Sequence, residues 1–234
     1  MYGFGFYRFD GTYILVLIGV VLSMLASSKV KTTFARYQRV RSMSGITGAE
    51  AAQRILHQSG IYDVRVEHVS GSLTDHYDPR SKVLRLSDSV YGSSSVAAVG
   101  VAAHECGHAV QHEKGYVPLS IRSALVPVAN FGANLAWPVF LMGLIFSIGP
   151  LLDIGILLFL AAVLFQLVTL PVEFNASSRA LRLLESNGIL YGEEIRDTRK
   201  VLSAAALTYV ASLAASVLQL LRLIILAGGR RRND

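Results

Sequence analysis

The residues that could do chemistry lie in the stretch 102–113, Ala-Ala-His-Glu-Cys-Gly-His-Ala-Val-Gln-His-Glu. His104 and His108 are four residues apart, so on a helix their imidazoles lie on one face, one turn apart, where both can bind a single zinc ion. Glu105 follows His104 and can take a proton from water that the metal polarises. The spacing therefore predicts the chemistry of a metal-dependent peptidase.

The sequence around the motif favours a buried helix. Residues 96–110 are rich in alanine and valine, contain no proline, and follow a serine-rich turn at 91–95 that offers several helix N-caps. Buried polar side chains need partners, and a metal would supply one for both histidines and the glutamate. The competing interpretation is a pair of ordinary core histidines bonded to the backbone.

A third metal ligand must come from elsewhere in the chain. His112 continues the four-residue spacing, but it lies about 12 Å from His104 along a continuous helix, too far for both to bind one ion. We expect His112 to lie beside the site or on the surface, and Cys106 to be a packing residue. Glu173 is the better candidate, since two histidines and a glutamate form a common catalytic zinc set. The alternative is an ordinary glutamate near a membrane boundary.

A second segment, Pro171-Val172-Glu173-Phe174-Asn175-Ala176-Ser177-x-Arg179-Ala180, strengthens the functional interpretation. Together with the motif at 104–112, it makes the chain similar, over nearly its whole length, to the bacterial neutral zinc metallopeptidases of the YugP-like group. These are small multi-pass membrane proteins, distantly related to HtpX-like and prenyl-protein peptidases. The resemblance implies zinc on His104, His108 and Glu173, with Glu105 as the general base.

One position departs from the wider pattern. In more distant gluzincins an aspartate often follows the ligand glutamate by four residues, and here that place is held by Ser177. A carboxylate that orients a zinc histidine from behind must therefore come from another residue, which the sequence does not identify, or be absent.

Composition indicates an integral membrane protein. Of the 234 residues, 52% are hydrophobic and only 16% are charged, and the mean hydropathy is +0.46. The apolar residues occur in long runs, and the basic residues that give the chain its net charge of +6 cluster next to those runs. This arrangement is typical of membrane topology and argues against a nucleic-acid partner.

The predicted fold is a mainly α membrane protein, a multi-pass helical bundle with a small α+β zincin-like peptidase domain. The aromatic residues at 1–10 suit a membrane interface. The uncharged runs and the motif positions divide the chain into five parts. These are an N-terminal transmembrane helix (1–28), a cytoplasmic metallopeptidase domain (29–122), a transmembrane helical hairpin (123–172), a loop and helix carrying the third zinc ligand (173–200), and a C-terminal hydrophobic helix with a basic tail (201–234).

The distribution of cations predicts the topology in the bacterial cell membrane. Five lysines and arginines at 29–41 follow the first apolar run, which places the peptidase domain and the active site on the cytoplasmic side. If the last apolar run, 201–221, also spans, parity puts the arginine tail outside, against the positive-inside tendency. A re-entrant or interfacial helix is the alternative for that run.

Within the peptidase domain, a capping box at Thr47 and Glu50 predicts a helix over 48–58. Residues 64–69 and 82–87 read as strands, and the turn residues at 71–80, with Asp75 and Asp78, read as a loop. By resemblance to peptidases with this motif, 82–87 is expected to be the sheet edge to which an extended peptide substrate would add.

The expected function is that of a membrane-embedded zinc-dependent endopeptidase near the cytoplasmic membrane surface, with a peptide or membrane protein as substrate and the lipid bilayer as its surroundings. Oligomeric state is left open. Tyr116 and Arg179 are candidates by type for stabilising the oxyanion. Two other classes fit the same residues: a non-catalytic zinc-binding scaffold or chaperone, and a metal transporter.

Overall fold

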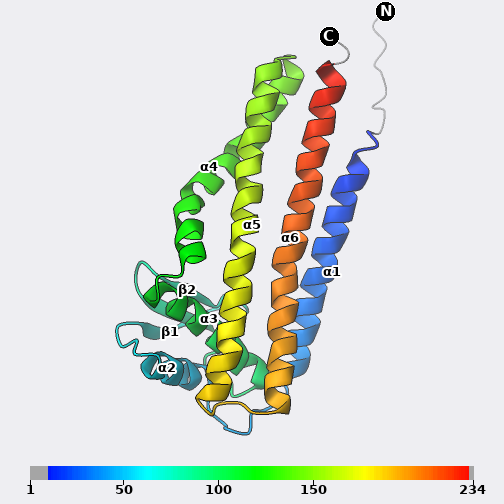
Figure 1. Cartoon of the computed structure of the whole chain (residues 1–234). Coiled ribbons are helices and arrows are strands. Elements are labelled where there is room, and N and C mark those ends of the chain that lie inside the picture. Colours follow the sequence, from blue (N-terminus) through cyan, green and yellow to red (C-terminus); the bar gives the residue numbers. More distant parts are fainter. Residues whose placement is uncertain (1–9, 232–234) are drawn as a thin grey trace, which may run out of the picture. The chain divides into compact units, whose positions relative to one another are not determined.

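The computed structural model describes residues 10–231, and the chain in that range is mostly helical. Among the described residues, four helices are long and apolar enough to cross a membrane. With one three-stranded sheet, this confirms the predicted class, a helical membrane protein with a small α+β part (Figure 1). In chain order the elements are α1 (Tyr13–Tyr37), α2 (Gly48–Gln58), β1 (Arg65–Val69), β2 (His76–Asp78), β3 (Val83–Ser87), α3 (Val96–Glu113), α4 (Val117–Ile145), α5 (Gly149–Ser186) and α6 (Glu193–Arg231).

Several helices are longer than the sequence pattern indicated. α1 continues past residue 28, where the first cations appear, to Tyr37. α4 begins at Val117 with Pro118 in its first turn, a place where the missing N–H costs no helical hydrogen bond. α5 runs unbroken through Pro171 and Glu173, so the third candidate ligand lies inside a helix. Residues 1–9 of the predicted interfacial segment 1–10, and the last tail residues, 232–234, lie outside the described residues.

The chain forms two compact units. Among the described residues, the first contains 10–25, 124–167 and 209–231, which include the most apolar parts of α1, α4, α5 and α6. Glycines let its helices pack closely: a side chain at Gly132 would meet the Leu158 carbonyl, and one at Gly155 would meet the backbone of Phe140. These pairings make α4 and α5 antiparallel neighbours, as expected for small residues at helix contacts in membranes.

α6 is one continuous helix over the last apolar run, and Arg222 in its second half contacts α1 and the residue before it. The Arg222 Nε donates to the Thr12 hydroxyl at 3.3 Å. Its guanidinium carbon lies 4.1 Å from the centre of the Tyr13 ring. Within this unit the start of α1 therefore lies beside the end of α6, and α6 is long enough to span.

The second unit contains residues 26–123 and 168–208. The predicted capping box is confirmed: the Thr47 side chain accepts from the Glu50 N–H, and the Glu50 carboxylate accepts from the Thr47 N–H at 2.7 Å. Ser95, from the serine-rich turn, is the N-cap of α3. α3 is buried along most of its length and packs against α2, β2 and β3.

The sheet corrects one prediction. Its strand order is β1-β3-β2, with β1 parallel and β2 antiparallel to β3. Residues 82–87 were predicted to form the free edge, but β3 is the central strand and is paired on both sides. The turn-rich stretch 71–80 concealed β2, which has only three residues and is too short to show an alternating pattern. Within the described sheet the edges are β1 and β2.

Candidate metal centre

Two helices bring the predicted ligands together. α3 places His104 and His108 one turn apart, with ring centroids 4.8 Å apart. α5 contributes Glu173, whose carboxylate Oε2 lies 3.3 Å from the His104 Nε2 and 3.6 Å from the His108 Nε2. Among the described residues, this is the group of three whose ligand atoms all lie within 4.8 Å of one another and could hold a metal ion.

A glycine inside the motif permits this approach of α5 to α3. A Cβ atom at Gly107 would lie 2.6 Å from the carbonyl oxygen of Ala176, closer than real Cβ contacts occur. Ala176 is three residues after Glu173 and is fully buried. The helix backbones therefore touch next to the ligand set, which fixes the height and distance of Glu173 relative to the histidines.

The hydrogen bonds behind His108 fix its tautomer. The Gln111 side-chain nitrogen donates to the Val172 carbonyl at 2.9 Å and to the Asn175 Oδ1 at 3.0 Å. Because a backbone carbonyl can only accept, the atom of Gln111 that faces Val172 must be the nitrogen of the amide and not its oxygen. The remaining Gln111 oxygen lies 3.0 Å from the His108 Nδ1 and can only accept from it. Neutral His108 therefore carries its proton on Nδ1, which leaves its Nε2 available to a metal.

His104 and Glu173 are also supported from outside the cluster. The Ser177 hydroxyl lies 3.1 Å from the His104 Nδ1, so the residue at the place of the aspartate is itself a partner of a candidate ligand histidine. The Arg122 Nη1 lies 3.2 Å from the Glu173 Oε1, the oxygen turned away from the histidines. Glu173 is 2% exposed, and the Arg122 cation offsets part of the cost of burying its charge.

The electrostatics of the site favour cation binding. Burial alone would lower the pKa of His108, but the hydrogen bond that protonated His108 donates to Glu173 and the charges of Glu105 and Glu173 outweigh it and raise the pKa. A site that attracts a proton in this way also attracts a divalent cation, which must compete with that proton.

Glu105, next to His104 on α3, contacts the edge strand β2. Its Oε2 accepts from the backbone N–H of Tyr77, in β2, at 3.0 Å. The Tyr77 hydroxyl lies 2.8 Å from the His112 Nδ1, and burial raises the pKa of Tyr77 to about 12. His112 thus lies outside the ligand set and on the exposed side, bonded to β2.

The remaining candidates take structural roles. Cys106 is fully buried with its Sγ 3.6 Å from the Ala52 carbonyl, and burial raises its thiol pKa well above the usual range. Asp75 accepts from the backbone and hydroxyl of Ser87. Asp78 accepts from the Arg80 N–H and the Ser81 hydroxyl, as a turn aspartate does.

The two residues suggested for the oxyanion face each other instead. The Arg179 guanidinium lies 5.7 Å from the centre of the Tyr116 ring, and its Nε donates to the Asn175 Oδ1 at 2.7 Å. Asn175 in turn accepts from Gln111. Arg179 therefore belongs to the chain of hydrogen bonds that holds His108.

Sequence reasoning missed Gln111, Asn175 and Arg122. Gln111 had a usable signal, since it follows His108 by three residues and so shares its helix face. Asn175 had only its four-residue spacing to Arg179 on the same helix, and its bond to Gln111 joins two helices. Arg122 had no signal, because its partner Glu173 lies on another helix.

The comparisons with known proteins agree with this geometry. Residues 12–228 match the family described as "putative neutral zinc metallopeptidase". The chain belongs to this family. It is also 50% identical over 220 residues to the protein of Bacillus subtilis (strain 168) named "putative membrane protease YugP", covering 94% of this chain and 98% of that protein. No solved structure matches the chain.

Family membership and structure together confirm the coarser predictions. The chain is a membrane-embedded member of a zinc metallopeptidase family, with four helices able to span and a His-His-Glu group able to hold a metal ion. Zinc is the cofactor that this family implies.

Proposed function

We propose that this protein is a zinc-dependent endopeptidase that hydrolyses peptide bonds near the cytoplasmic surface of the bacterial cell membrane. Zinc is held by His104, His108 and Glu173, and Glu105 is the general base. The observation that carries the proposal is the direction of the ligand atoms: both histidine Nε2 atoms face one oxygen of a buried carboxylate.

The donor set fits zinc. Two imidazole nitrogens and one carboxylate oxygen form a catalytic set that leaves a fourth position open, whereas structural zinc sites are usually closed by a fourth protein ligand. Gln111 fixes the tautomer of His108 that a metal requires. When bound, zinc supplies Lewis-acid polarisation of a carbonyl group and lowers the pKa of water.

Glu105 handles the proton. It precedes Cys106 on the helix and is 9% exposed, so its side chain is largely buried but still reaches solvent. The N–H of Tyr77 holds one of its oxygens and leaves the other to accept a proton from the attacking water. The same carboxyl group then passes that proton to the amine that leaves when the peptide C–N bond breaks.

β2 is the edge strand to which a peptide substrate would add. This strand pairs with β3 on one side, and none of the other described strands pairs with its second side. An extended peptide can add there through backbone hydrogen bonds. Because the Tyr77 N–H already contacts Glu105, a peptide along this edge would lie beside the general base. The substrate class that fits is therefore any unfolded or extended segment, including one from a membrane protein.

The cytoplasmic placement is supported by charge. Residues 11–49 hold five lysines and arginines and no acidic residue, and all five cations follow the uncharged run 11–28. Such a bias favours a cytoplasmic position for the residues after the first span. The second unit, which carries the metal centre, begins at Ala26.

The decisive experiment compares Glu105→Gln with Glu113→Gln, an exposed glutamate at the end of the same helix. Protein purified in detergent is assayed for zinc content and for cleavage of an unfolded protein such as casein. We expect Glu105→Gln to keep zinc but to lose at least about a hundredfold in kcat, and Glu113→Gln to behave as wild type. Glu173→Ala should lose zinc as well as activity.

Each other class predicts a different result. A non-catalytic scaffold would show no cleavage in the wild type that depends on zinc or on Glu105. A metal transporter would carry zinc into vesicles at the same rate with Glu105→Gln as without it. Unchanged zinc content in Glu173→Ala would remove Glu173 from the site.

A further inference from the structure

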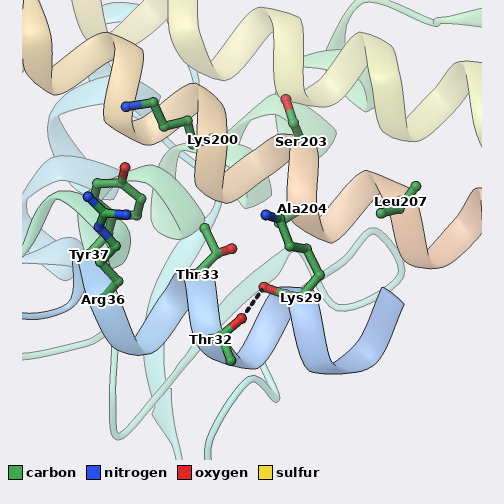
Figure 2. Close-up of a pocket in the computed structure, with 9 residues that line it drawn as sticks. All are labelled: Lys29, Thr32, Thr33, Arg36, Tyr37, Lys200, Ser203, Ala204 and Leu207. Carbon is green, nitrogen blue, oxygen red and sulfur yellow. Dashed lines mark hydrogen bonds between the residues drawn. The ribbon is translucent and has the colours of Figure 1, made fainter. Parts of the chain in front are cut away.

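A groove that the metal centre does not use lies between the second half of α1 and the first half of α6, in the second unit. It has a volume of about 560 Å³. Tyr37 and Ala204, each 5% exposed, are its buried residues. Figure 2 shows side chains from the two helices lining it, with Lys200 and Leu207 at separate places along α6.

The groove is positively charged. Lys29, Arg36 and Lys200 line it, and none of its lining residues is acidic. The Lys200 ammonium contacts Asp197 at 2.9 Å, which offsets part of one charge. The Arg36 guanidinium and the Lys200 ammonium also lie 5.5 and 5.6 Å from the centre of the Tyr37 ring, which holds both cations at one end of the groove.

The groove also offers neutral donors. The Thr33 and Ser203 hydroxyls line it and make no hydrogen bond within the described part of the chain. The Thr32 hydroxyl, by contrast, is bonded to the Ser28 carbonyl of its own helix. Cations with free hydroxyl donors form the set that binds a phosphate oxygen.

The surroundings distinguish a lipid from a free anion. Lys29 is the first charged residue after the uncharged run 11–28, and Lys200 is the last before the apolar run 201–221. Leu207, 45% exposed, adds an apolar wall to the same groove. The charged end thus passes directly into apolar surface, as a molecule with a phosphate group and an acyl chain requires.

We propose that this groove binds the phosphodiester headgroup of an anionic membrane phospholipid, with Lys29, Arg36 and Lys200 around the phosphate and an acyl chain beside Leu207. The bound lipid would bridge α1 and α6 where both helices leave their apolar segments. This binding is separate from the proposed zinc chemistry and does not require it.

The test uses the full-length protein in nanodiscs of phosphatidylcholine with 20% phosphatidylglycerol. Lipids that remain bound after transfer to detergent are counted by native mass spectrometry. The groove variant is Lys29→Gln, Arg36→Gln and Lys200→Gln together. Its matched control, Lys31→Gln, Arg39→Gln and Arg199→Gln, removes three exposed cations that do not line the groove.

We expect wild type and control to retain phosphatidylglycerol in preference to phosphatidylcholine. In the groove variant, the ratio of retained phosphatidylglycerol to phosphatidylcholine should fall at least about tenfold, since each cation near an anionic lipid contributes roughly a fivefold preference. Equal losses in both variants would overturn the proposal in favour of general surface charge. So would wild-type protein with no preference for phosphatidylglycerol. Binding of inorganic phosphate that displaces the lipid completely at millimolar concentration would assign the groove to a free anion.

A second measurement does not depend on the folding of the variants. A phosphatidylglycerol with a photoreactive acyl chain is crosslinked to the wild-type protein, and the labelled peptides are mapped. We expect label near Leu207 on α6. Label spread evenly over the apolar helices would overturn the proposal.

Discussion

Gly107→Ala is the sharpest test of how the metal centre is built. The new Cβ would lie 2.6 Å from the Ala176 carbonyl oxygen, whereas ordinary contacts begin at 3.4 Å, so α5 must move by about 0.8 Å. Ligand sets tolerate shifts of only about 0.5 Å. Alanine gains about 1 kcal/mol in helix propensity, but overpacking costs about 1–3 kcal/mol. We expect a net loss of up to about 2 kcal/mol and zinc affinity about 10–100-fold weaker.

Two variants serve as controls. Gly228→Ala adds a methyl group in a helix with nothing within 4 Å, so stability should stay level or rise slightly. Gly100→Ala, on the same helix as the motif, meets the side-chain methyl of Thr198 on α6 at 2.6 Å. It should cost stability without moving α5 and so without changing zinc affinity.

The assay is competition for zinc with a chromogenic chelator, combined with thermal unfolding of the metal-free protein. If Gly107→Ala binds zinc within about twofold of wild type, the contact with Ala176 does not set the position of Glu173. If Gly100→Ala and Gly107→Ala lose the same affinity, the effect reflects general strain in α3.

Three further perturbations test the same site. Gln111→Leu removes the acceptor of the His108 proton and should weaken zinc binding about 10–100-fold, whereas Gln111→Glu, which keeps an acceptor, should lose less; equal affinities would refute the tautomer argument. The pKa of His108 is raised above 6.5, so metal-free protein should lose stability as the pH rises from 6.5 through that raised value. Zinc affinity should increase over the same pH interval, because the proton that competes with zinc is lost. A zinc affinity already constant above pH 6.5 would contradict this. Because burial raises the pKa of the Cys106 thiol, alkylation at pH 8 should proceed at the rate of unfolding, and labelling of native protein within minutes would show an open core.

The sequence predicted the parts of the site that depend on local spacing. His104 and His108 share a face because a helix has a fixed period, and the capping box at Thr47 follows from a short motif with a defined hydrogen-bond pattern. The long apolar runs indicated the candidate spans, since the length and composition of a segment, both read from the sequence, show whether a helix is long and apolar enough to cross a bilayer.

The parts that depend on tertiary contact were not predictable in this way. β2 is a strand only because β3 and Glu105 accept its backbone, and its residues carry no alternation of their own. Because β2 was not predicted, β3 was expected to be an edge strand, whereas it lies in the centre of the sheet. Ser177 was recognised as a departure from the wider pattern, but its bond to His104 depends on the approach of α5 at Gly107.

The charge balance of the centre gives Arg122 a role that can be separated from zinc. Without metal, the buried Glu173 carboxylate faces the Arg122 cation at 3.2 Å on one oxygen and the two histidines on the other. With metal, the ion supplies the compensating charge, so Arg122 matters less to stability. Removing Arg122 should therefore destabilise the metal-free protein more than the zinc-loaded protein, by about 1–3 kcal/mol for a hydrogen bond to a charged group in a partly exposed pair.

The measurement is the unfolding midpoint of Arg122→Gln and wild type, each with zinc and after chelation. Arg182→Gln, which removes an exposed arginine from α5, serves as the control and should show little change in either state. An Arg122→Gln loss of equal size with and without zinc would mean that Arg122 supports the fold in general. In that case the buried carboxylate must be stabilised in the metal-free protein by its contacts with His104 and His108 rather than by Arg122.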